Sequence, residues 1–550
     1  MVNGYVIGVS SGMWAIKRAE ELLGLHRKAS WAATAGVTFT QIDLESITEF
    51  QEPDLEYKIK RIRELGMDFG IHGEAYAMQG VDTMPLSSAL HTDYGRAHER
   101  LLKHIENAGK LKAKFLTVHS SESHPFIVLG RELQPSRLVD PWGRPFEEFL
   151  EKFPWVLDWA ITMKYVLEIG AHRYLRTHDY KKLLEEQERE ELQRIYEEER
   201  NFRKMANAAH IAQGMSFPEL TMEEIKSKFG DKEKKEAKRK LDDSLKKFII
   251  SFASTDDLSY GCEKVAYFIV AKYMMQTKHP IWKGIVGGDI DDEDLPKDEF
   301  TTKWVPAVAA FYAWGHFMQD ACPGGKGPFQ DPKPLLDKYK LYYSFETPMA
   351  MTGYELHARM SRLFYIYHMI KNVRSEWMSI TMDMEHMLGN NLNPKEEIDS
   401  LPQDAGKYLK IVHITTPSPL NPSHMPVPLG SEPQFYIYER LWDIRKKGFK
   451  DGWMIFERGG EEGMVKQTVL SMRKIKKYLE MDVAPDLLPE DFFGFEPGQP
   501  LVAIQQNLIK EHYLEPLKGL LAIPEEEYGF LSTAAIQKGK QEEWRKEKYR

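Results

Sequence analysis

The sequence predicts an α/β fold, a (β/α)8 barrel of the TIM type with a large, mostly helical insertion after its fourth strand. Short β-branched and aromatic runs alternate with helical patterns over residues 1–119, and the same rhythm returns over residues 340–480. Alternation of this kind indicates parallel strands joined by right-handed crossovers. Each stretch supplies four strands, and together they approach the ~250 residues of such a barrel.

The first half of the barrel is predicted within residues 1–119. Its strands are short runs rich in β-branched and aromatic residues, and Gly66 is placed to end a helix. The expected strands are Tyr5–Val9, Val37–Leu44, Met67–His72 and Lys114–His119, and the expected helices are Trp14–Leu25, Asp54–Leu65 and Asp93–Ala108.

The second half of the barrel is predicted within residues 340–480 by the same two patterns. The expected strands are Leu341–Glu346, Ser379–Asp383, Leu409–Ile414 and Trp453–Glu457, and the expected helices are Tyr354–Val373, Pro394–Leu401, Gln434–Lys447 and Glu462–Leu479. Residues 481–550 are expected to form a C-terminal extension that packs on the barrel and ends in a charged, frayed segment.

Residues 120–339 form the predicted helical insertion. They include densely charged helical patterns at Tyr180–Met205 and Lys226–Lys247, and apolar ones at Tyr260–Met275 and Trp304–Met318. The stretch is too long for a loop and too regular for a linker. Because it follows a barrel strand, it leaves from the face where such barrels hold their active sites. It could therefore form a lid or substrate wall, or serve oligomerisation or stability.

Composition indicates a globular protein, with 42% hydrophobic and 29% charged residues in a chain of 550. Two cysteines cannot build a disulfide framework or a thiolate zinc site. The sequence lacks both a membrane-spanning apolar run and a signal-peptide pattern, so we expect a cytoplasmic protein. The net charge of −9 argues weakly against a broad nucleic-acid surface, although a local basic track remains compatible with it.

Six of the eight predicted strands end in a possible metal ligand. In a closed barrel these ends meet at one mouth. Counting back by two from each candidate gives residues on the same face as that candidate, such as Thr117 behind His119 and Ser344 behind Glu346. The candidates, in chain order, are His72, His119, Glu346, Asp383, His413 and Glu457. They are therefore expected to face the barrel interior in one consistent register.

A cluster of three histidines and three carboxylates predicts a metal centre. Buried carboxylates repel one another unless some take up protons or a cation lies between them. Nitrogen and oxygen donors together suit Zn, Mn, Fe or Co better than Ca or Mg. Glu346 lies between the two groups of donors along the chain, so it could bridge two cations about 3.5–4 Å apart.

Further candidates extend this site. His386 follows Asp383 in the spacing D-x-x-H, and His424 lies in the proline-rich loop after His413. Both are predicted to bind metal or substrate. Tyr76 is an aromatic candidate for substrate contact, while Glu385 is expected to lie behind the ligands or to face solvent.

The strand-end segments resemble the xylose isomerase-like TIM barrel superfamily, and most specifically endonuclease IV (AP endonuclease family 2). The resemblance covers the barrel and does not extend to the insertion. The segments that carry it are FGIHGEAY, FLTVHSS, YYSFETP, ITMDMEH, LKIVH and WMIFE.

The resemblance to endonuclease IV implies a metal-dependent hydrolase that cleaves phosphodiester bonds, with two or three zinc ions. DNA with an abasic or damaged site would be the substrate, Glu346 would orient or deprotonate the nucleophile, and Tyr76 would wedge into the base stack. One zinc would be held by His72, His119 and Glu346, a second by Glu346, Asp383, His413 and Glu457, and a third by His386 and His424. The third site of that family also uses an aspartate, where this chain has Pro422.

The same superfamily contains sugar isomerases and epimerases, which gives a second interpretation. These enzymes resemble this chain in the quartet Glu346, Asp383, His413 and Glu457, usually with one Mn or Co. Glu346 and Glu457 would then exchange a proton with a small sugar or sugar phosphate. A mononuclear epimerase does not need His72 and His119 as ligands, whereas a multinuclear phosphodiesterase does. A non-enzymatic scaffold is a third possibility, which the intact ligand set disfavours.

Overall fold

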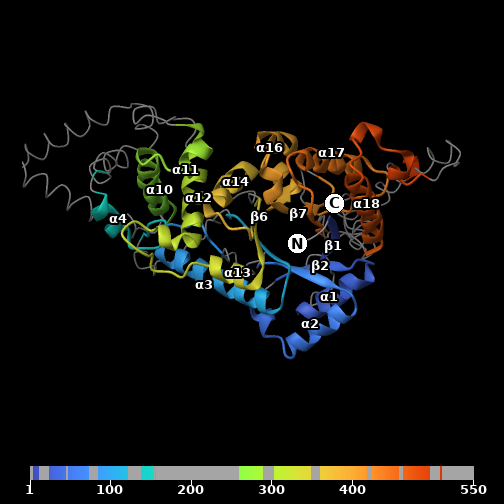
Figure 1. The fold of residues 1–550 in the computed structure, drawn as a ribbon, viewed down its shortest axis with the longest axis horizontal. Coiled ribbons are helices and arrows are strands. Elements are labelled where there is room, and N and C mark those ends of the chain that lie inside the picture. The colour runs from blue at the N-terminus through green and yellow to red at the C-terminus, as the bar shows by residue number, and fades with distance from the viewer. Residues whose placement is uncertain are drawn as a thin grey trace, which may run out of the picture.

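The computed structural model is a closed barrel of eight parallel strands in sequence order, with β8 paired to β1 (Figure 1). It describes residues 4–11, 24–44, 47–73, 84–121, 138–153, 155, 259–288, 303–348, 359–417, 424–457, 462–495 and 508–510. The strands are β1 (Tyr5–Ser11), β2 (Phe39–Asp43), β3 (Asp68–His72), β4 (Phe115–His119), β5 (Tyr342–Glu346), β6 (Met378–Asp383), β7 (Leu409–Ile414) and β8 (Gly452–Phe456). The predicted fold class is thereby confirmed.

Helices cover the outside of the barrel. In the first half these are α1 (Leu25–Thr34), α2 (Leu55–Glu64) and α3 (His91–Lys110), and in the second half α14 (Leu363–Val373), α15 (Met384–Gly389), α16 (Pro394–Ser400), α17 (Glu432–Lys446) and α18 (Glu462–Glu480). Short 3-10 turns lie at Ile47–Gln51, Gln319–Ala321, Ala405–Tyr408, Pro485–Leu487 and Glu490–Phe493.

Two helices differ from the prediction. The described helix between β1 and β2 begins at Leu25, where the predicted one ends, and residues 12–23 lie outside the described residues. Helix α14 begins at Leu363 because Arg362 before it is extended, with φ −100° and ψ 142°. The prediction had continued this helix back to Tyr354, through residues 359–362, which are not helical.

The segment between β4 and β5 supplies α4 (Phe146–Lys152), α10 (Ser259–Gln276), α11 (Pro280–Trp282), a π-helical turn (Lys283–Gly287), α12 (Val305–Phe317) and α13 (Lys333–Tyr339). Helix α12 is buried from Pro306 to Phe317 and contacts both α10 and α14. A helix that is apolar all round must be enclosed in this way. Figure 1 shows α10 and α12 on one side of the barrel and α17 and α18 on the other.

Some predictions about this segment are not tested by the described residues. The charged helices predicted at Tyr180–Met205 and Lys226–Lys247 lie outside them. The boundaries of the insertion, 120–339, and of the C-terminal extension, 481–550, stay predictions. Within the described part of the chain, no helix is long and apolar enough to cross a membrane.

The barrel interior is layered beneath its mouth. An apolar layer is formed by Phe39, Phe115, Ile411, Trp453 and Ile455. Gly70 in β3 makes room for it, since a Cβ at this position would lie 2.3 Å from the Phe115 ring. The next layer is hydroxylic, with the Thr381 Oγ1 atom 2.7 Å from both Thr117 Oγ1 and Ser344 Oγ. This order confirms the predicted interior register.

Candidate metal centre

The mouth of the barrel gathers all six predicted strand-end donors. They come from five adjacent strands, β3 to β7, and from the residue directly after β8. His119 and Glu457 are partly exposed, at 20% and 15% of their side chains, and the others are buried. The six are His72, His119, Glu346, Asp383, His413 and Glu457. Donors far apart in the chain therefore meet because parallel strands end at the same rim.

Three carboxylates converge on one imidazole nitrogen. His413 Nδ1 lies 3.0 Å from Glu346 Oε1, 3.3 Å from Asp383 Oδ2 and 3.1 Å from Glu457 Oε2. Two ligands that each lie about 2.1 Å from one cation are roughly 3.0–3.4 Å apart at octahedral or tetrahedral angles. The distances from His413 therefore fit ligands of a single ion. The same three carboxylates also form a donor group with His386, in which the ligand atoms all lie within 4.8 Å of one another.

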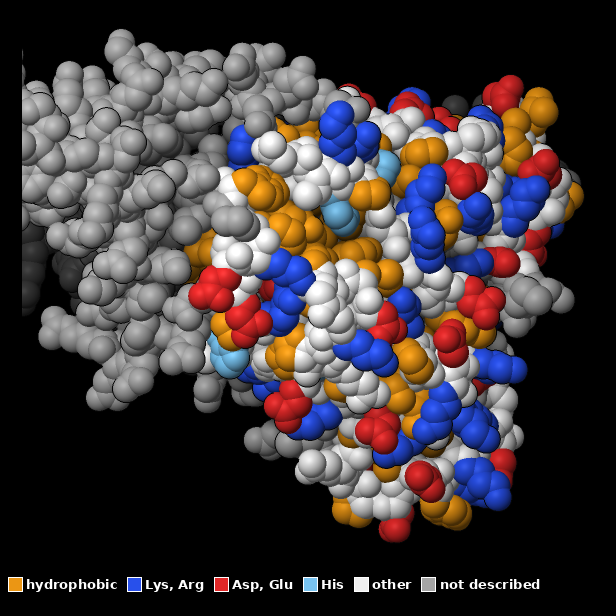
Figure 2. Space-filling view, turned by 60° about the vertical axis from the view of Figure 1, so that its left-hand side comes forward, with side chains coloured by type: hydrophobic (Ala, Val, Ile, Leu, Met, Phe, Trp, Pro, Cys, Tyr) orange, Lys and Arg blue, Asp and Glu red, His pale blue; other side chains and the backbone are white. Residues whose placement is uncertain are grey.

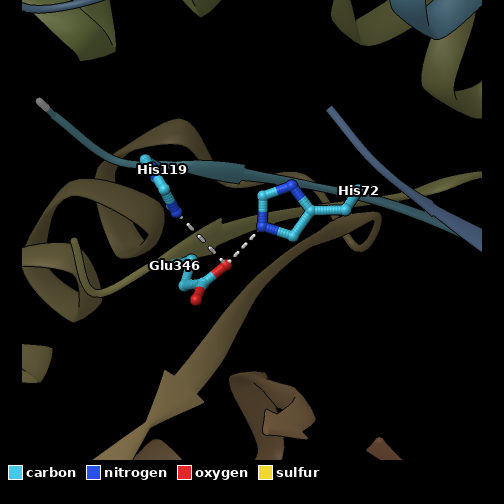
Figure 3. A group of neighbouring side chains, drawn as sticks. All are labelled: His72, His119 and Glu346. Carbon is cyan, nitrogen blue, oxygen red and sulfur yellow. Dashed lines mark hydrogen bonds and ion pairs between the residues drawn. The ribbon is translucent and has the colours of Figure 1, made fainter. Parts of the chain in front are cut away.

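His72 and His119 form a second donor group together with Glu346. The Oε2 atom of Glu346 lies 2.9 Å from His72 Nε2 and 3.9 Å from His119 Nε2 (Figure 3). The Nδ1 atom of His72 lies 2.7 Å from the carbonyl oxygen of Gly73, so a proton on Nδ1 leaves Nε2 free to act as a donor to a cation. The two oxygens of Glu346 thus face different donor groups, as a bridging carboxylate requires.

A third group forms at the edge of the mouth from His386, His424 and Glu457, whose donor atoms lie within 4.8 Å of one another. Asp383 caps α15, because its carboxylate accepts a hydrogen bond from the His386 backbone amide at 2.9 Å. This cap holds His386 beside the quartet, with its Nδ1 atom 3.3 Å from Glu346 Oε1. The D-x-x-H spacing therefore places both side chains at one site.

The structure decides between the two positions predicted for Glu385. Its side chain is fully buried, and its Oε2 atom lies 3.1 Å from His424 Nδ1. Glu385 therefore lies behind the ligands and does not face solvent, because α15 begins directly after Asp383 and Glu385 lies in its first turn. The candidate Tyr76 lies outside the described residues, and so does Pro422, which stands where the third zinc site of endonuclease IV has an aspartate.

The pKa values of the clustered histidines indicate whether the site suits a cation. Burial by itself would lower the pKa of His72, His386 and His424, but the surrounding carboxylates raise these pKa values to about 9, 10 and 9. The pKa of His413 is likewise raised well above its ordinary value, against the effect of burial. Without a cation, protons on the imidazoles compensate the carboxylates, and a divalent ion can replace them. The residues present therefore fit a divalent cation.

His119 differs from the other imidazoles. Burial lowers its pKa to about 4, and the pull of Glu346 does not overcome this. It is therefore neutral at pH 7 and offers a lone pair without first losing a proton.

We expect cation binding to release protons and to weaken as the pH falls. Ligating imidazoles must be deprotonated, and the raised pKa values mean that most of them carry protons at pH 7.5 before the ion arrives. Affinity should fall by roughly tenfold per pH unit for each proton displaced. Calorimetric titration with Co²⁺ in two buffers of different ionisation enthalpy measures this release. Equal binding heats in both buffers would contradict it.

The β2 strand contributes two residues that sequence reasoning missed. Gln41 Oε1 lies 3.1 Å from His413 Nε2, and Gln41 Nε2 lies 3.1 Å from Asp43 Oδ1. The predicted strand ran on to Leu44, which hid the fact that Asp43 is a seventh polar strand end. Had the predicted second strand ended at Asp43 and not at Leu44, Asp43 would have been recognised as a strand-end side chain on the same interior face as the other donors.

Comparison with known proteins gives no relative in sequence: no protein-family model matches the chain, and no curated protein matches it. Solved structures of similar fold include a D-tagatose 3-epimerase-like protein, with 11% identity, 87% of this chain and 98% of that chain covered, and a TM-score of 0.39. The E. coli 3-keto-D-glucoside 4-epimerase YcjR has 9% identity, 86% and 99% coverage, and a TM-score of 0.36. A putative xylose isomerase from Rhodospirillum rubrum has 10% identity, 86% and 99% coverage, and a TM-score of 0.35.

These likenesses are too weak to carry an argument about the site or its chemistry. The three structures are named as sugar epimerases or isomerases, and the predicted closeness to endonuclease IV is not shown by them.

Proposed function

We propose that this chain is a metal-dependent sugar isomerase or epimerase whose divalent cation is held by Glu346, Asp383, His413 and Glu457. The observation that carries the proposal is the convergence of three carboxylate oxygens on His413 Nδ1, all within 3.3 Å. One imidazole among three carboxylates is an oxygen-rich set, which suits Mn²⁺ or Co²⁺.

Glu346 and Glu457 are the proposed acid and base. They come from β5 and from the end of β8, which are separated in the barrel by β6 and β7, so they reach the quartet from different sides. Burial raises the pKa of each, but the surrounding imidazoles, His413 first among them, more than offset this and hold both pKa values well below the usual range. Both carboxylates are therefore ionised, and one of them can accept a proton from the carbon beside a carbonyl.

The cation, when bound, would polarise the carbonyl oxygen of the sugar and so acidify the neighbouring carbon. The other Glu would return the proton to the substrate. His386, and His119 with its partly exposed ring, would hydrogen-bond sugar hydroxyls; both lie beside Glu346, at 3.3 Å and 3.9 Å. A small sugar or sugar phosphate is therefore the proposed substrate class.

A second candidate function is favoured by the pairing of His72 and His119 with Glu346 Oε2. A mononuclear epimerase has no need of these ligands, whereas a phosphodiesterase of the endonuclease IV type would hold two or three zinc ions and clamp the attacking and leaving oxygens between them. DNA with an abasic site would then be the substrate. On the face seen in Figure 2, however, the Lys and Arg side chains of the described residues alternate with Asp and Glu and do not form one continuous basic track.

Two measurements distinguish the two functions: the number of metal ions bound per protein chain, and the exchange of substrate hydrogen with solvent. Enzyme loaded with Mn²⁺, Co²⁺ or Zn²⁺ is analysed for its ion-to-protein ratio, then incubated with a panel of ketoses and aldoses in D₂O and, separately, with abasic duplex DNA. An isomerase or epimerase should hold one tightly bound ion and place deuterium on a substrate carbon. Two or more tight zinc ions together with cut DNA would establish the second function. The first is lost if no sugar exchanges hydrogen under any metal.

Substituting His119→Ala gives a further test. If the sugar enzyme is correct, kcat/KM should fall by less than about tenfold, because His119 then only contacts substrate. If the phosphodiesterase is correct, one ion should be lost and cleavage should fall by roughly 10³-fold or more, because a ligand of the first ion is gone. The exposed His91→Ala in α3 is the matched control and should change neither quantity.

A further inference from the structure

His413 has a partner on the side away from the carboxylates. While its Nδ1 atom faces the quartet, its Nε2 atom lies 3.1 Å from the side-chain oxygen of Gln41. Gln41 is fully buried in β2, and its side-chain nitrogen lies 3.1 Å from Asp43 Oδ1. The three side chains form a hydrogen-bonded series that leads from the proposed cation across the barrel mouth to the end of β2, which is separated from β7 by β8 and β1.

The chemistry of this series fixes its direction. An ionised carboxylate only accepts hydrogen bonds, so the amide NH₂ of Gln41 must face Asp43 and its amide oxygen must face His413. That oxygen can only accept, so His413 must carry a proton on Nε2. Once a cation displaces the proton on Nδ1, the lone pair of Nδ1 is directed at the point where the three carboxylates meet.

The far end of the series is anchored. Lys28 is buried, and its ammonium group donates to the backbone carbonyl of Asp43 and, at 3.1 Å, to Glu49 Oε2. The end of β2 is thereby tied to α1 and to the 3-10 turn at Ile47–Gln51. Asp43 consequently has little freedom to move away from Gln41.

We infer that Gln41, oriented by Asp43, is a positioning residue that sets the tautomer and the direction of His413 for cation binding. The inference rests on the metal centre of the proposed function, and it assigns β2 a part in that centre. Partners that orient a metal-binding histidine typically change metal affinity by roughly 10- to 100-fold when they are removed.

The test compares three variants by Co²⁺ affinity, measured in competition with a chelator. Gln41→Leu keeps a similar volume but removes both hydrogen bonds, so the affinity should fall by roughly 10- to 100-fold. The double variant Q41E/D43N exchanges the amide and the carboxylate without changing the charge. The glutamate at position 41 can accept hydrogen bonds both from the asparagine amide at position 43 and from the His413 ring, so the affinity should return to the wild-type value or exceed it.

The matched control is Gln434→Leu, at a buried glutamine of α17 that donates to the Phe492 carbonyl. This variant should bind Co²⁺ as the wild type does.

Nitrogen-15 spectra of the imidazoles in the Zn²⁺-loaded enzyme give a readout that a general loss of stability would not produce. His413 should carry its proton on Nε2 in the wild type and in Q41E/D43N. If Gln41→Leu does not fold, the double variant Q41E/D43N tests the inference. A natively folded double variant that binds Co²⁺ tenfold more weakly than the wild type would overturn it. Wild-type affinity in Gln41→Leu, or an equal loss in Gln434→Leu, would overturn it as well. A wild-type enzyme that binds no divalent ion would instead remove the metal centre itself.

Discussion

Replacing Glu346 by glutamine is expected to lower kcat/KM by roughly 10³-fold or more and to weaken cation binding sharply. Glu346 is fully buried, and its two oxygens approach four imidazoles. Oε1 lies 3.0 Å from His413 Nδ1 and 3.3 Å from His386 Nδ1, while Oε2 lies 2.9 Å from His72 Nε2 and 3.9 Å from His119 Nε2. An amide replaces one of these oxygens by an NH₂ group, which cannot bind a cation, and it removes a full negative charge.

The matched control for this substitution is Glu64→Gln at the end of α2, where the side chain is 49% exposed and pairs only with Arg61 among the ion pairs of the described residues. It should leave ion content and turnover unchanged. Ion content is measured after gel filtration, and the fold is checked by circular dichroism. If Glu346→Gln keeps more than about a tenth of the wild-type turnover with its ion bound, both candidate functions are contradicted, since each needs this carboxylate.

The strand-end donors could be predicted from sequence because two simple regularities act together. Parallel strands of a closed barrel all end at one rim, and side chains alternate between the two faces of each strand. His119 and Glu346 lie directly opposite each other in the β4–β5 register, as that reasoning requires. A local error of one or two residues in a strand therefore did not disturb the assignment of these donors.

The partners behind the donors could not be predicted in the same way. Gln41 is an ordinary residue type, and its role depends on a hydrogen bond to His413, which lies 372 positions away. Glu385 is buried at the site because α15 begins directly after Asp383, and the His424 side chain lies against it. Such contacts follow from the packed structure, since sequence periodicity reports which face a side chain lies on but not which neighbour it meets.

Replacing Gly315 by alanine is expected to lower the free energy of unfolding by about 3 kcal/mol or more, because α12 packs too closely against its neighbours to accept a side chain there. Gly315 lies in α12, and a Cβ atom there would be 1.7 Å from the backbone oxygen of Pro141. Tyr94 donates to that same oxygen at 2.8 Å, and Tyr312 donates to the Val139 carbonyl at 2.8 Å. Because both sides of the contact are backbone, no side-chain rotation can relieve the overlap.

The matched control for this effect is Gly95→Ala in α3, where an added Cβ would meet no atom within 4 Å. Alanine favours a helix over glycine, so this variant should be unchanged or more stable by roughly 0.5–1 kcal/mol. Urea unfolding followed by tryptophan fluorescence and by circular dichroism compares the two variants, and α12 itself contributes Trp314 as a probe beside the contact. Equal midpoints for Gly315→Ala and Gly95→Ala would mean that α12 does not press on the segment around Pro141. A selective loss in Gly315→Ala, seen as one transition that shifts equally by fluorescence and by circular dichroism, would show that α12 and the barrel unfold as one packed unit, as the contact of α12 with α14 leads us to expect.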